Sequence, residues 1–322
     1  MIKGHGDDTY QYEGIRMNFS SNIPQHADLT ALKRHLGTRL DAIANYPEPE
    51  AWTLERLIAQ KLGVPPECVV ATSGATEAIY LTAQTFRMHH DIATPTFSEY
   101  ADAISIYRSY AKKTRALWLC NPNNPTGSVL GWQAVYERMS RYDLVVIDQS
   151  YEGYTDEPLL SAREAVAAGN VVQIHSMTKT YGVPGLRLGY LVASRRLAEQ
   201  LRRHMQPWAV SALAVEAGLF LVEHATPLRP DLAEAQRLWH RLNDIEGISM
   251  MPTRTNFMLG TVSGSTANEL KEHLAREYKM LIRDASNFQG LTPHHFRIAA
   301  QTPQENDALV DAIEHFMQQK HG

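Results

Sequence analysis

A short segment of the chain brings together several side chains that could do covalent chemistry. Residues 176–189 read SMTKTYGVPGLRLG, so hydroxyl groups, Lys179, turn glycines and Arg187 lie close together in the sequence. A lysine in a loop after a buried strand can form a Schiff base when an anionic, aromatic group lies beside it. An arginine guanidinium suits the recognition of phosphate. The segment indicates such chemistry only if other loops support it, because Ser-x-Thr-Lys also occurs by chance.

Three other loops carry groups that could bind a ligand beside this lysine. Ser73-Gly74-Ala75-Thr76-Glu77 follows an apolar run and opens a helix. It offers backbone N–H groups to a phosphate, and an ordinary helix cap is the alternative. Residues 121–127, NPNNPTG, follow the next apolar run, and Asp148 ends another. Because open α/β sheets bind ligands at the carboxyl ends of their strands, the four loops together indicate one shared site.

Short apolar runs alternate with helical patterns through the middle of the chain, and these elements must position the loops. The runs of strand length are residues 68–71, 116–120, 144–147, 171–174 and 188–193. A helical stripe of apolar residues over 54–62 ends at Gly63 and Pro65. Strands that are apolar throughout and separated by helices predict a three-layer α/β/α domain with a mostly parallel sheet.

The pattern changes after residue 194. Three helical stretches come first, near 197–203, 213–222 and 232–242. After them, strands are expected near 256–259, 280–283 and 295–299, and helices near 266–277 and 304–317. This order predicts a second, smaller α+β domain. We expect an N-terminal arm over 1–25, a large domain over 26–220 and a small domain over 221–322, with the boundary in or beside a helix between 210 and 230.

The composition argues against several classes of protein. The 322 residues include 31 basic and 35 acidic side chains, and a net charge of -4 gives no general attraction to nucleic acid or to an anionic membrane. Apolar runs fall short of the ~20 residues of a membrane span, and the first residues lack a signal-peptide core, so we expect a cytoplasmic protein. Cys68 and Cys120 are expected to be buried thiols. The scattered histidines predict no metal site, and His89-His90 and His294-His295 are expected in loops or on the surface.

Taken together, the motifs resemble those of the fold-type I pyridoxal-phosphate enzymes, the aspartate aminotransferase superfamily. Asn-Pro-Thr-Gly, Asp-x-x-Tyr and Ser-x-Thr-Lys with a later arginine occur here in the family's order. The resemblance implies pyridoxal 5'-phosphate as cofactor and a homodimer with shared active sites. It implies three catalytic residues: Lys179 as the Schiff-base lysine, Asp148 at the ring nitrogen, and Tyr151, with Asn124, at the phenolic oxygen. The other implied cofactor-binding residues are Gly74, Ala75, Thr76, Phe97, Ser176, Thr178 and Arg187, with Tyr46 supplied by the partner subunit.

Two subgroups share these motifs, the threonine-phosphate decarboxylases of cobalamin biosynthesis and the histidinol-phosphate aminotransferases. The start of the chain and the segments IRDASNFQGL and FRIA resemble the decarboxylases. We therefore expect decarboxylation of O-phospho-L-threonine to (R)-1-aminopropan-2-yl phosphate, and an aminotransferase of the histidinol-phosphate type or on another amino acid is the alternative. Arg283 and Arg297 are expected at strand ends, where two cations can pair with a carboxylate and a phosphate. The implied substrate-binding residues are His5, Gly6, Asn22, Asn124, Arg283 and Arg297.

The chain departs from the decarboxylase pattern at three places. Asp7 stands where the family's His-Gly-Gly element has its second glycine, and residues 23–26 differ from the usual Ile-Asn-Pro-Leu. The interval between Tyr100 and Ala116 is shorter than is usual in the family. Either the large domain is smaller here, or some residues are absent from this sequence.

Overall fold

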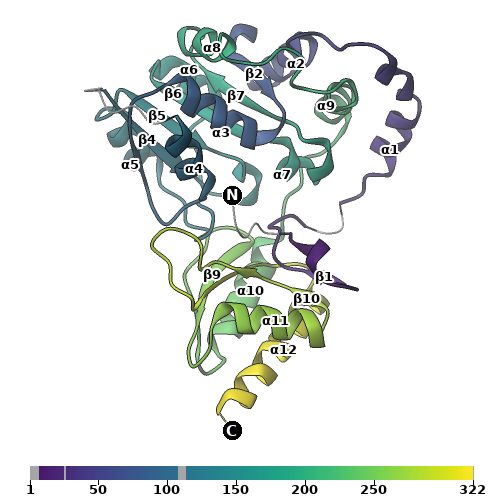
Figure 1. Ribbon diagram of the computed structural model, residues 1–322, viewed down its shortest axis with the longest axis vertical. Helices are drawn as coiled ribbons and strands as arrows, with labels where there is room; N and C mark the ends of the chain where they lie inside the picture. The colour runs from purple at the N-terminus through teal and green to yellow at the C-terminus, as the bar shows by residue number, and fades with distance from the viewer. Residues whose placement is uncertain (1–6, 25–26, 108–113, 322) are drawn as a thin grey trace.

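The computed structural model describes residues 7–24, 27–107 and 114–321, which form two units, one above the other in Figure 1. Among the described residues, the upper unit contains a six-stranded sheet and the lower unit a four-stranded sheet. The C-terminal helix α12 (Pro303–His321) lies at the far end of the lower unit.

The six-stranded sheet has the order β2-β7-β6-β5-β4-β3. Its strands are β2 (Val69–Thr72), β3 (His89–Ile92), β4 (Arg115–Cys120), β5 (Leu144–Asp148), β6 (Val171–Ser176) and β7 (Gly189–Ala193). Strands β3 to β6 run parallel to one another, whereas β7 is antiparallel to both of its neighbours. The carboxyl ends of β4, β5 and β6 therefore meet at one edge, where such sheets bind ligands.

Helices cover both faces of this sheet. The helices α3 (Gly74–Thr85), α4 (Glu99–Ile106) and α8 (Arg195–Arg202) pack on one face. The other face is covered by α2 (Trp52–Leu62) and α9 (Ala212–His224) on one side and by α5 (Trp132–Met139) and α6 (Ala162–Ala168) on the other. Strand side chains are buried whichever way they point, which explains the unbroken apolar runs. The expected three-layer α/β/α arrangement is confirmed.

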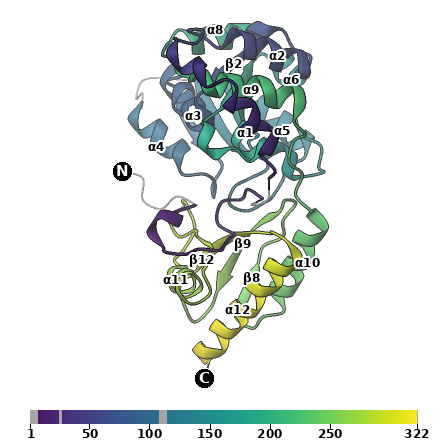
Figure 2. The same cartoon turned by 90° about the vertical axis from the view of Figure 1, so that its right-hand side faces the viewer.

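The second unit has the antiparallel sheet order β11-β12-β9-β8. Its strands are β8 (Ile248–Met250), β9 (Phe257–Val262), β11 (Arg283–Asp284) and β12 (His295–Ala299). The helices α10 (Leu232–Asn243), α11 (Ala267–Glu277) and α12 share one apolar core with this sheet. Near the start of the chain, β1 (Met17–Asn18) pairs in parallel with β10 (Met280–Leu281), so this N-terminal segment packs on the second unit (Figure 2).

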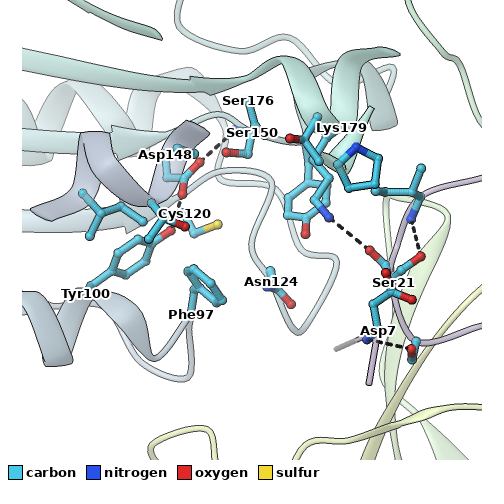
Figure 3. Close-up of a pocket in the computed structure, with 18 of the residues that line it drawn as sticks. Asp7, Ser21, Phe97, Tyr100, Cys120, Asn124, Asp148, Ser150, Ser176 and Lys179 are labelled. Atoms are coloured by element: carbon cyan, nitrogen blue, oxygen red, sulfur yellow. Dashed lines mark hydrogen bonds between the residues drawn. The ribbon is translucent and has the colours of Figure 1, made fainter. Parts of the chain in front are cut away.

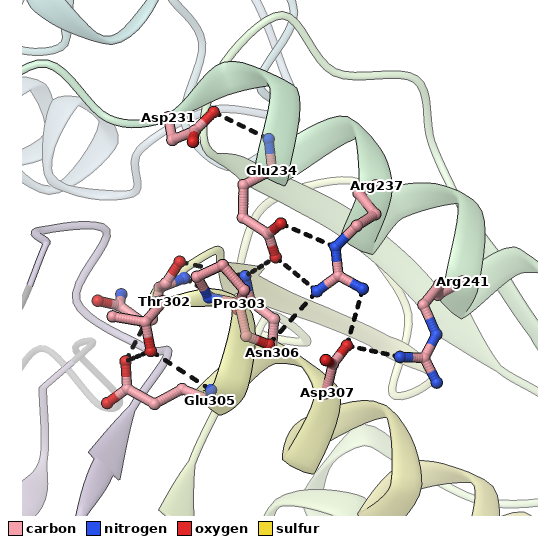
Figure 4. Close-up of polar contacts among 10 residues, drawn as sticks. Asp231, Glu234, Arg237, Arg241, Thr302, Pro303, Glu305, Asn306 and Asp307 are labelled. Atoms are coloured by element: carbon pink, nitrogen blue, oxygen red, sulfur yellow. Dashed lines mark hydrogen bonds and ion pairs between the residues drawn. The ribbon is translucent and has the colours of Figure 1, made fainter.

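A polar network fastens α12 to α10 (Figure 4). Asn306 is fully buried, and its Nδ2 donates to Glu234 Oε1 at 2.7 Å. Arg237 donates twice to the same carboxylate and once to Asp307, each at 2.8 Å. Asn306 also bonds the backbone N–H and C=O of Gln301, shortly after β12 ends. The network therefore stabilises both the helix pair and the exit of β12.

One expectation about individual residues is met in part and another is wrong. His89 is exposed, as expected, but it and His90 belong to strand β3 and not to a loop, and His90 Nδ1 accepts a hydrogen bond from Trp118 Nε1 at 2.9 Å. The strand was not recognisable as an apolar run because an edge strand can keep polar residues. His295 opens β12 in the same way. Arg297 lies in the middle of β12, and not at its end, because β12 continues through two further residues that pair with β9.

Cys68 and Cys120 are free and buried, as expected. Over residues 7–24, 27–107 and 114–321, no helix is long and apolar enough to cross a membrane. The same residues contain no group of His, Cys, Asp and Glu side chains that could hold a metal ion.

Candidate active site

A cavity of about 280 Å³ lies at the carboxyl ends of β4, β5 and β6 (Figure 3). Its walls come from both units. The upper unit contributes residues such as Ala75, Thr76, Phe97, Tyr100, Cys120, Asn124, Asp148, Tyr151, Ser176, Thr178, Lys179 and Arg187. The other walls come from the N-terminal segment, through Asp7, Ser20, Ser21 and Ile23, and from Arg297 of the second unit.

Lys179 extends into this cavity from the short helix α7 (Met177–Tyr181). Its Nζ donates to the carbonyl oxygen of Ser21 at 3.1 Å and lies 5.7 Å from the ring centre of Tyr151. Part of the side chain is accessible through the cavity, but protein surrounds the amine. This burial, assisted by the positive charges of Arg297 and Arg187, lowers the pKa of Lys179 to about 8. A substantial fraction of the amine is therefore neutral, and nucleophilic, near neutral pH.

Asp148 ends β5 and is held by two donors. Its Oδ2 accepts from the hydroxyl of Tyr100 at 2.7 Å, and its Oδ1 accepts from the backbone N–H of Ser150 at 2.8 Å. Tyr100 is fully buried, and burial together with the nearby carboxylate raises the pKa of its phenol. The phenol therefore stays protonated and keeps the carboxylate oriented toward the cavity.

Another part of the cavity wall is suited to an anion. The first turn of α3 begins at Gly74, and within the described residues the preceding Ser73 makes no side-chain capping hydrogen bond. A Cβ on Gly74 would lie 2.9 Å from Arg187 Nη2, so the guanidinium lies directly over this turn. Gly189 approaches the same turn from β7, where a Cβ would lie 2.9 Å from Ala75 N. Uncapped N–H groups at a helix start and an arginine together favour phosphate.

Thr178 gives a further indication that this part of the cavity suits an anion. Its hydroxyl is buried and has no hydrogen-bond partner among the described residues. Buried polar groups are rarely left unpaired in folded proteins. Since Thr178 is also one of the residues that line the cavity, an anion bound there could supply a partner for this hydroxyl.

Arg297 is the cation at the side of the cavity that faces the second unit. It is 4% exposed, its Nη1 donates to Asn124 Oδ1 at 2.5 Å, and its Nη2 donates to the carbonyl oxygen of Ser20. Burial lowers the pKa of its guanidinium to about 10, so it remains charged near neutral pH. Its Nε has no partner within the described part of the chain. A buried arginine with an unused donor suits an anionic substrate group.

The structure brings together most of the site residues suggested by the sequence, but two of the described ones, Asn22 and Arg283, do not line the cavity. Asn22 lies behind the cavity wall, where its Nδ2 donates to the Tyr151 hydroxyl at 3.2 Å. Arg283 pairs with Arg297 across the β11–β12 ladder, but it is not among the described residues that line the cavity, and its Nη2 donates to Asn287 at 2.7 Å. His5 and Gly6 lie outside the described residues.

Tyr46 also lies away from the cavity of its own chain. Its side chain is 85% exposed, and its ring centre is 5.3 Å from that of Trp208. Its role in a partner's site therefore stays a prediction.

Several contributors to the cavity had not been assigned from the sequence. Tyr100 is one, although its motif Pro95-Thr96-Phe97-Ser98-Glu99-Tyr100 could have suggested it. Asp7 is another, and it adopts a left-handed conformation with φ of 65° at the position of the family's second glycine. Its backbone N–H donates to Ser20 Oγ at 3.0 Å. The contact of Ser21 with Lys179 joins residues 158 positions apart and left no signal in the sequence.

The fold and this site together define a class of protein. A lysine, a strand-end carboxylate and an anion-binding turn that line one cavity, on a three-layer α/β/α unit with a smaller second unit, are the arrangement expected of the aminotransferase superfamily. The sequence profile described as aminotransferase class I and II matches residues 105–313, and the chain belongs to this family.

Comparisons with individual proteins are more specific. The crystal structure of L-threonine-O-3-phosphate decarboxylase from Porphyromonas gingivalis has a TM-score of 0.88 and 34% identity, covering 94% of this chain and 100% of that chain. Threonine-phosphate decarboxylase of Salmonella typhimurium is 28% identical, over 92% of this chain and 90% of its own length. Histidinol-phosphate aminotransferase of Geobacillus thermodenitrificans is 26% identical, over 94% and 91%. The chain is therefore similar to members of both subgroups.

Proposed function

We propose that this chain is a pyridoxal-phosphate-dependent carboxy-lyase that converts O-phospho-L-threonine to (R)-1-aminopropan-2-yl phosphate and CO₂, a step of cobalamin side-chain biosynthesis. The observation that carries the proposal is the similarity to threonine-phosphate decarboxylases along nearly the whole chain, at 34% and 28% identity. We place the reaction in the cytoplasm, in keeping with the expectation from the sequence.

The polar groups of the cavity suit pyridoxal 5'-phosphate. Asp148 would pair with the ring nitrogen, and its existing hydrogen bonds hold it in place for that contact. Arg187, the Thr178 hydroxyl and the first turn of α3 would bind the phosphate. Lys179, which lines the same cavity, is the amine that would bond the cofactor's carbonyl carbon. When bound, the cofactor supplies an electron sink for the charge that develops at the substrate's Cα.

The chain's own residues would then orient the substrate. Arg297 faces the cavity from β12 and would bind a substrate anion, with Asn124 and Ser20 holding the guanidinium in place. Orientation decides the reaction, because only the Cα bond perpendicular to the cofactor ring is activated. Holding the Cα–carboxylate bond in that direction gives decarboxylation, whereas holding the Cα–H bond there gives transamination. Lys179, with a pKa of about 8, can hold or return a proton at Cα.

Incubation of the purified protein with O-phospho-L-threonine and pyridoxal phosphate tests the proposal. We expect CO₂ and the amino-alcohol phosphate to form in equal amounts without any 2-oxo acid, and Lys179→Ala to abolish both. Conversion of the cofactor to its pyridoxamine form, with turnover only after an oxo acid is added, would contradict it. That result would favour the second candidate, an aminotransferase, which the 26% identity to a histidinol-phosphate aminotransferase supports.

We further propose a homodimer with shared active sites, in which Tyr46 reaches the partner's phosphate site. Large apolar side chains are exposed in this part of the sequence and at Trp208, whose ring contacts that of Tyr46: Leu40, Ile43, Tyr46, Trp52 and Trp208 are between 46% and 85% exposed. The backbone N–H of Trp208 donates to the carbonyl oxygen of Pro49 at 2.8 Å. This hydrogen bond joins the segment of Trp208 to the segment that contains Tyr46 and Trp52. Exposed apolar patches of this kind mark interaction surfaces.

A further inference from the structure

The helix that carries Lys179 is held at its carbonyl end by a tyrosine from a different segment. Tyr154 ends the single turn Glu152–Tyr154 that follows β5, and only 1% of its surface is exposed. Its hydroxyl donates to the backbone carbonyl oxygen of Lys179 at 2.9 Å. The lysine is therefore fixed both at its amine, by Ser21, and at its backbone, by Tyr154.

This hydrogen bond matters because α7 is only five residues long. The last carbonyl groups of a helix have no partner within the helix, and a helix this short is unstable by itself. The carbonyl of Thr178 accepts hydrogen bonds from the next turn, and that of Thr180 accepts from the N–H of Leu228 at 2.7 Å. The Lys179 carbonyl receives its hydrogen bond from a side chain, so its position depends on the identity of residue 154.

The ring of Tyr154 also packs against the aromatic residue that lies beside the lysine amine. It packs edge-on against Tyr151, with ring centres 5.5 Å apart and an interplanar angle of 76°. Tyr151 is the ring beside the lysine amine. Together with Phe257 and Ala299, the two tyrosines form a buried cluster that joins the upper unit to β9 and β12. One residue thus contacts the lysine's backbone and the aromatic ring next to its amine.

We propose that Tyr154 is a positioning residue, which holds Lys179 through its backbone carbonyl so that the amine points into the cavity. The inference rests on the proposed role of Lys179 and not on the identity of the substrate. Without the hydroxyl, the carbonyl loses its partner and the end of α7 loosens. Because burial is the main cause of the low pKa of Lys179, water reaching the amine would raise that pKa toward its ordinary value.

Tyr154→Phe removes the hydroxyl and keeps the ring. The apoprotein is mixed with pyridoxal phosphate, and capture by Lys179 is followed by visible absorbance from about pH 6 to 10, with borohydride trapping and peptide mapping to verify the site. We expect the midpoint of capture to rise by about 0.5 pH unit or more and the rate near pH 7.5 to fall about threefold. With O-phospho-L-threonine, kcat should fall while KM stays within about twofold.

Three further variants separate positioning from a general loss of packing. Tyr190→Phe is the matched control, since Tyr190 lies on β7 with its ring stacked on His175. Within the described part of the chain, its side chain makes no hydrogen bond to α7. 4-Aminophenylalanine at position 154 restores a donor and should restore the wild-type midpoint. 4-Fluorophenylalanine there fills the volume of the oxygen without a donor, and serves as the second donor-free variant should Tyr154→Phe fail to fold.

An unchanged midpoint and capture rate in the donor-free variants would overturn the proposal. Equal shifts in Tyr154→Phe and Tyr190→Phe would do so as well, because they would indicate a general effect of removing a buried hydroxyl. Wild-type protein that captures the cofactor but leaves O-phospho-L-threonine unchanged would overturn the proposed function alone, since the capture comparison does not use that substrate.

Discussion

Replacing Arg297 with glutamine should make Lys179 a weaker nucleophile near neutral pH. The pKa of Lys179 is lowered from its ordinary 10.5 to about 8, chiefly by burial and next by the positive charge of Arg297. A lowered lysine pKa favours the neutral amine, which gains in population as the pH rises through that pKa. Near pH 7.5 about a quarter of the amine is neutral, whereas about one in a thousand would be neutral at a pKa of 10.5.

Arg297→Gln removes the charge but keeps a side-chain amide that can donate to Asn124 and to the carbonyl of Ser20. One pKa unit corresponds to about 1.4 kcal/mol, which is the size expected for a charge pair inside a protein cavity. We therefore expect the pKa of Lys179 to rise by about one unit. The neutral fraction near pH 7.5 then falls to about 3%, and capture of pyridoxal phosphate slows about eightfold.

The assay is stopped-flow absorbance of apoprotein with pyridoxal phosphate across about pH 6 to 10. Arg254→Gln is the control, because Arg254 is exposed and its ion pair is with Glu157 at 3.6 Å, away from the cavity. The control should reproduce the wild-type profile. If the midpoint for Arg297→Gln stays in place or moves to lower pH, the charge of Arg297 does not lower the pKa of Lys179.

Three further changes test the phosphate end, the second unit and the exposed patch. Gly189→Ala places a Cβ against the backbone N of Ala75, so the Kd for pyridoxal phosphate should rise about tenfold in equilibrium dialysis. An unchanged Kd would argue against phosphate binding at the first turn of α3. Asn306→Ala leaves Glu234 without one of its donors, so urea titration should show a free energy of unfolding lower by about 2 to 4 kcal/mol; a loss below about 0.5 kcal/mol would contradict the network's importance. Tyr46→Asp should weaken the dimer at least about tenfold in sedimentation equilibrium, whereas an equally tight dimer would place the interface elsewhere.

Much of the upper unit was predictable from the sequence because its strands are buried on both faces. Such strands must be apolar at successive positions, so β4, β5 and β6 stand out as runs with polar loops directly after them. Strand β3 was not predictable in this way, since it lies at the sheet edge and reads His-His-Asp-Ile. The residue types at the strand ends, Asp148 and Lys179 among them, were likewise visible as local motifs.

The directions in which individual side chains point were not predictable from the sequence. Arg283 and Arg297 are opposite one another in a two-strand ladder and looked equivalent in the sequence. Arg297 lines the cavity, while Arg283 bonds Asn287. Which of the two faces a ligand depends on how the second unit packs against the first, and no local pattern records that packing.

The sequence by itself determined the class of fold and the chemical groups at the strand ends, because both follow from interactions between residues close together along the chain. The tertiary structure decided what surrounds those groups. Ser21 reaches Lys179 from 158 residues away, Arg297 reaches Asn124 from 173, and Tyr154 holds the lysine's carbonyl from a separate loop. The first two contacts arise only when the N-terminal segment and the second unit meet the upper unit around the cavity, and burial there together with the charge of Arg297 lowers the lysine pKa.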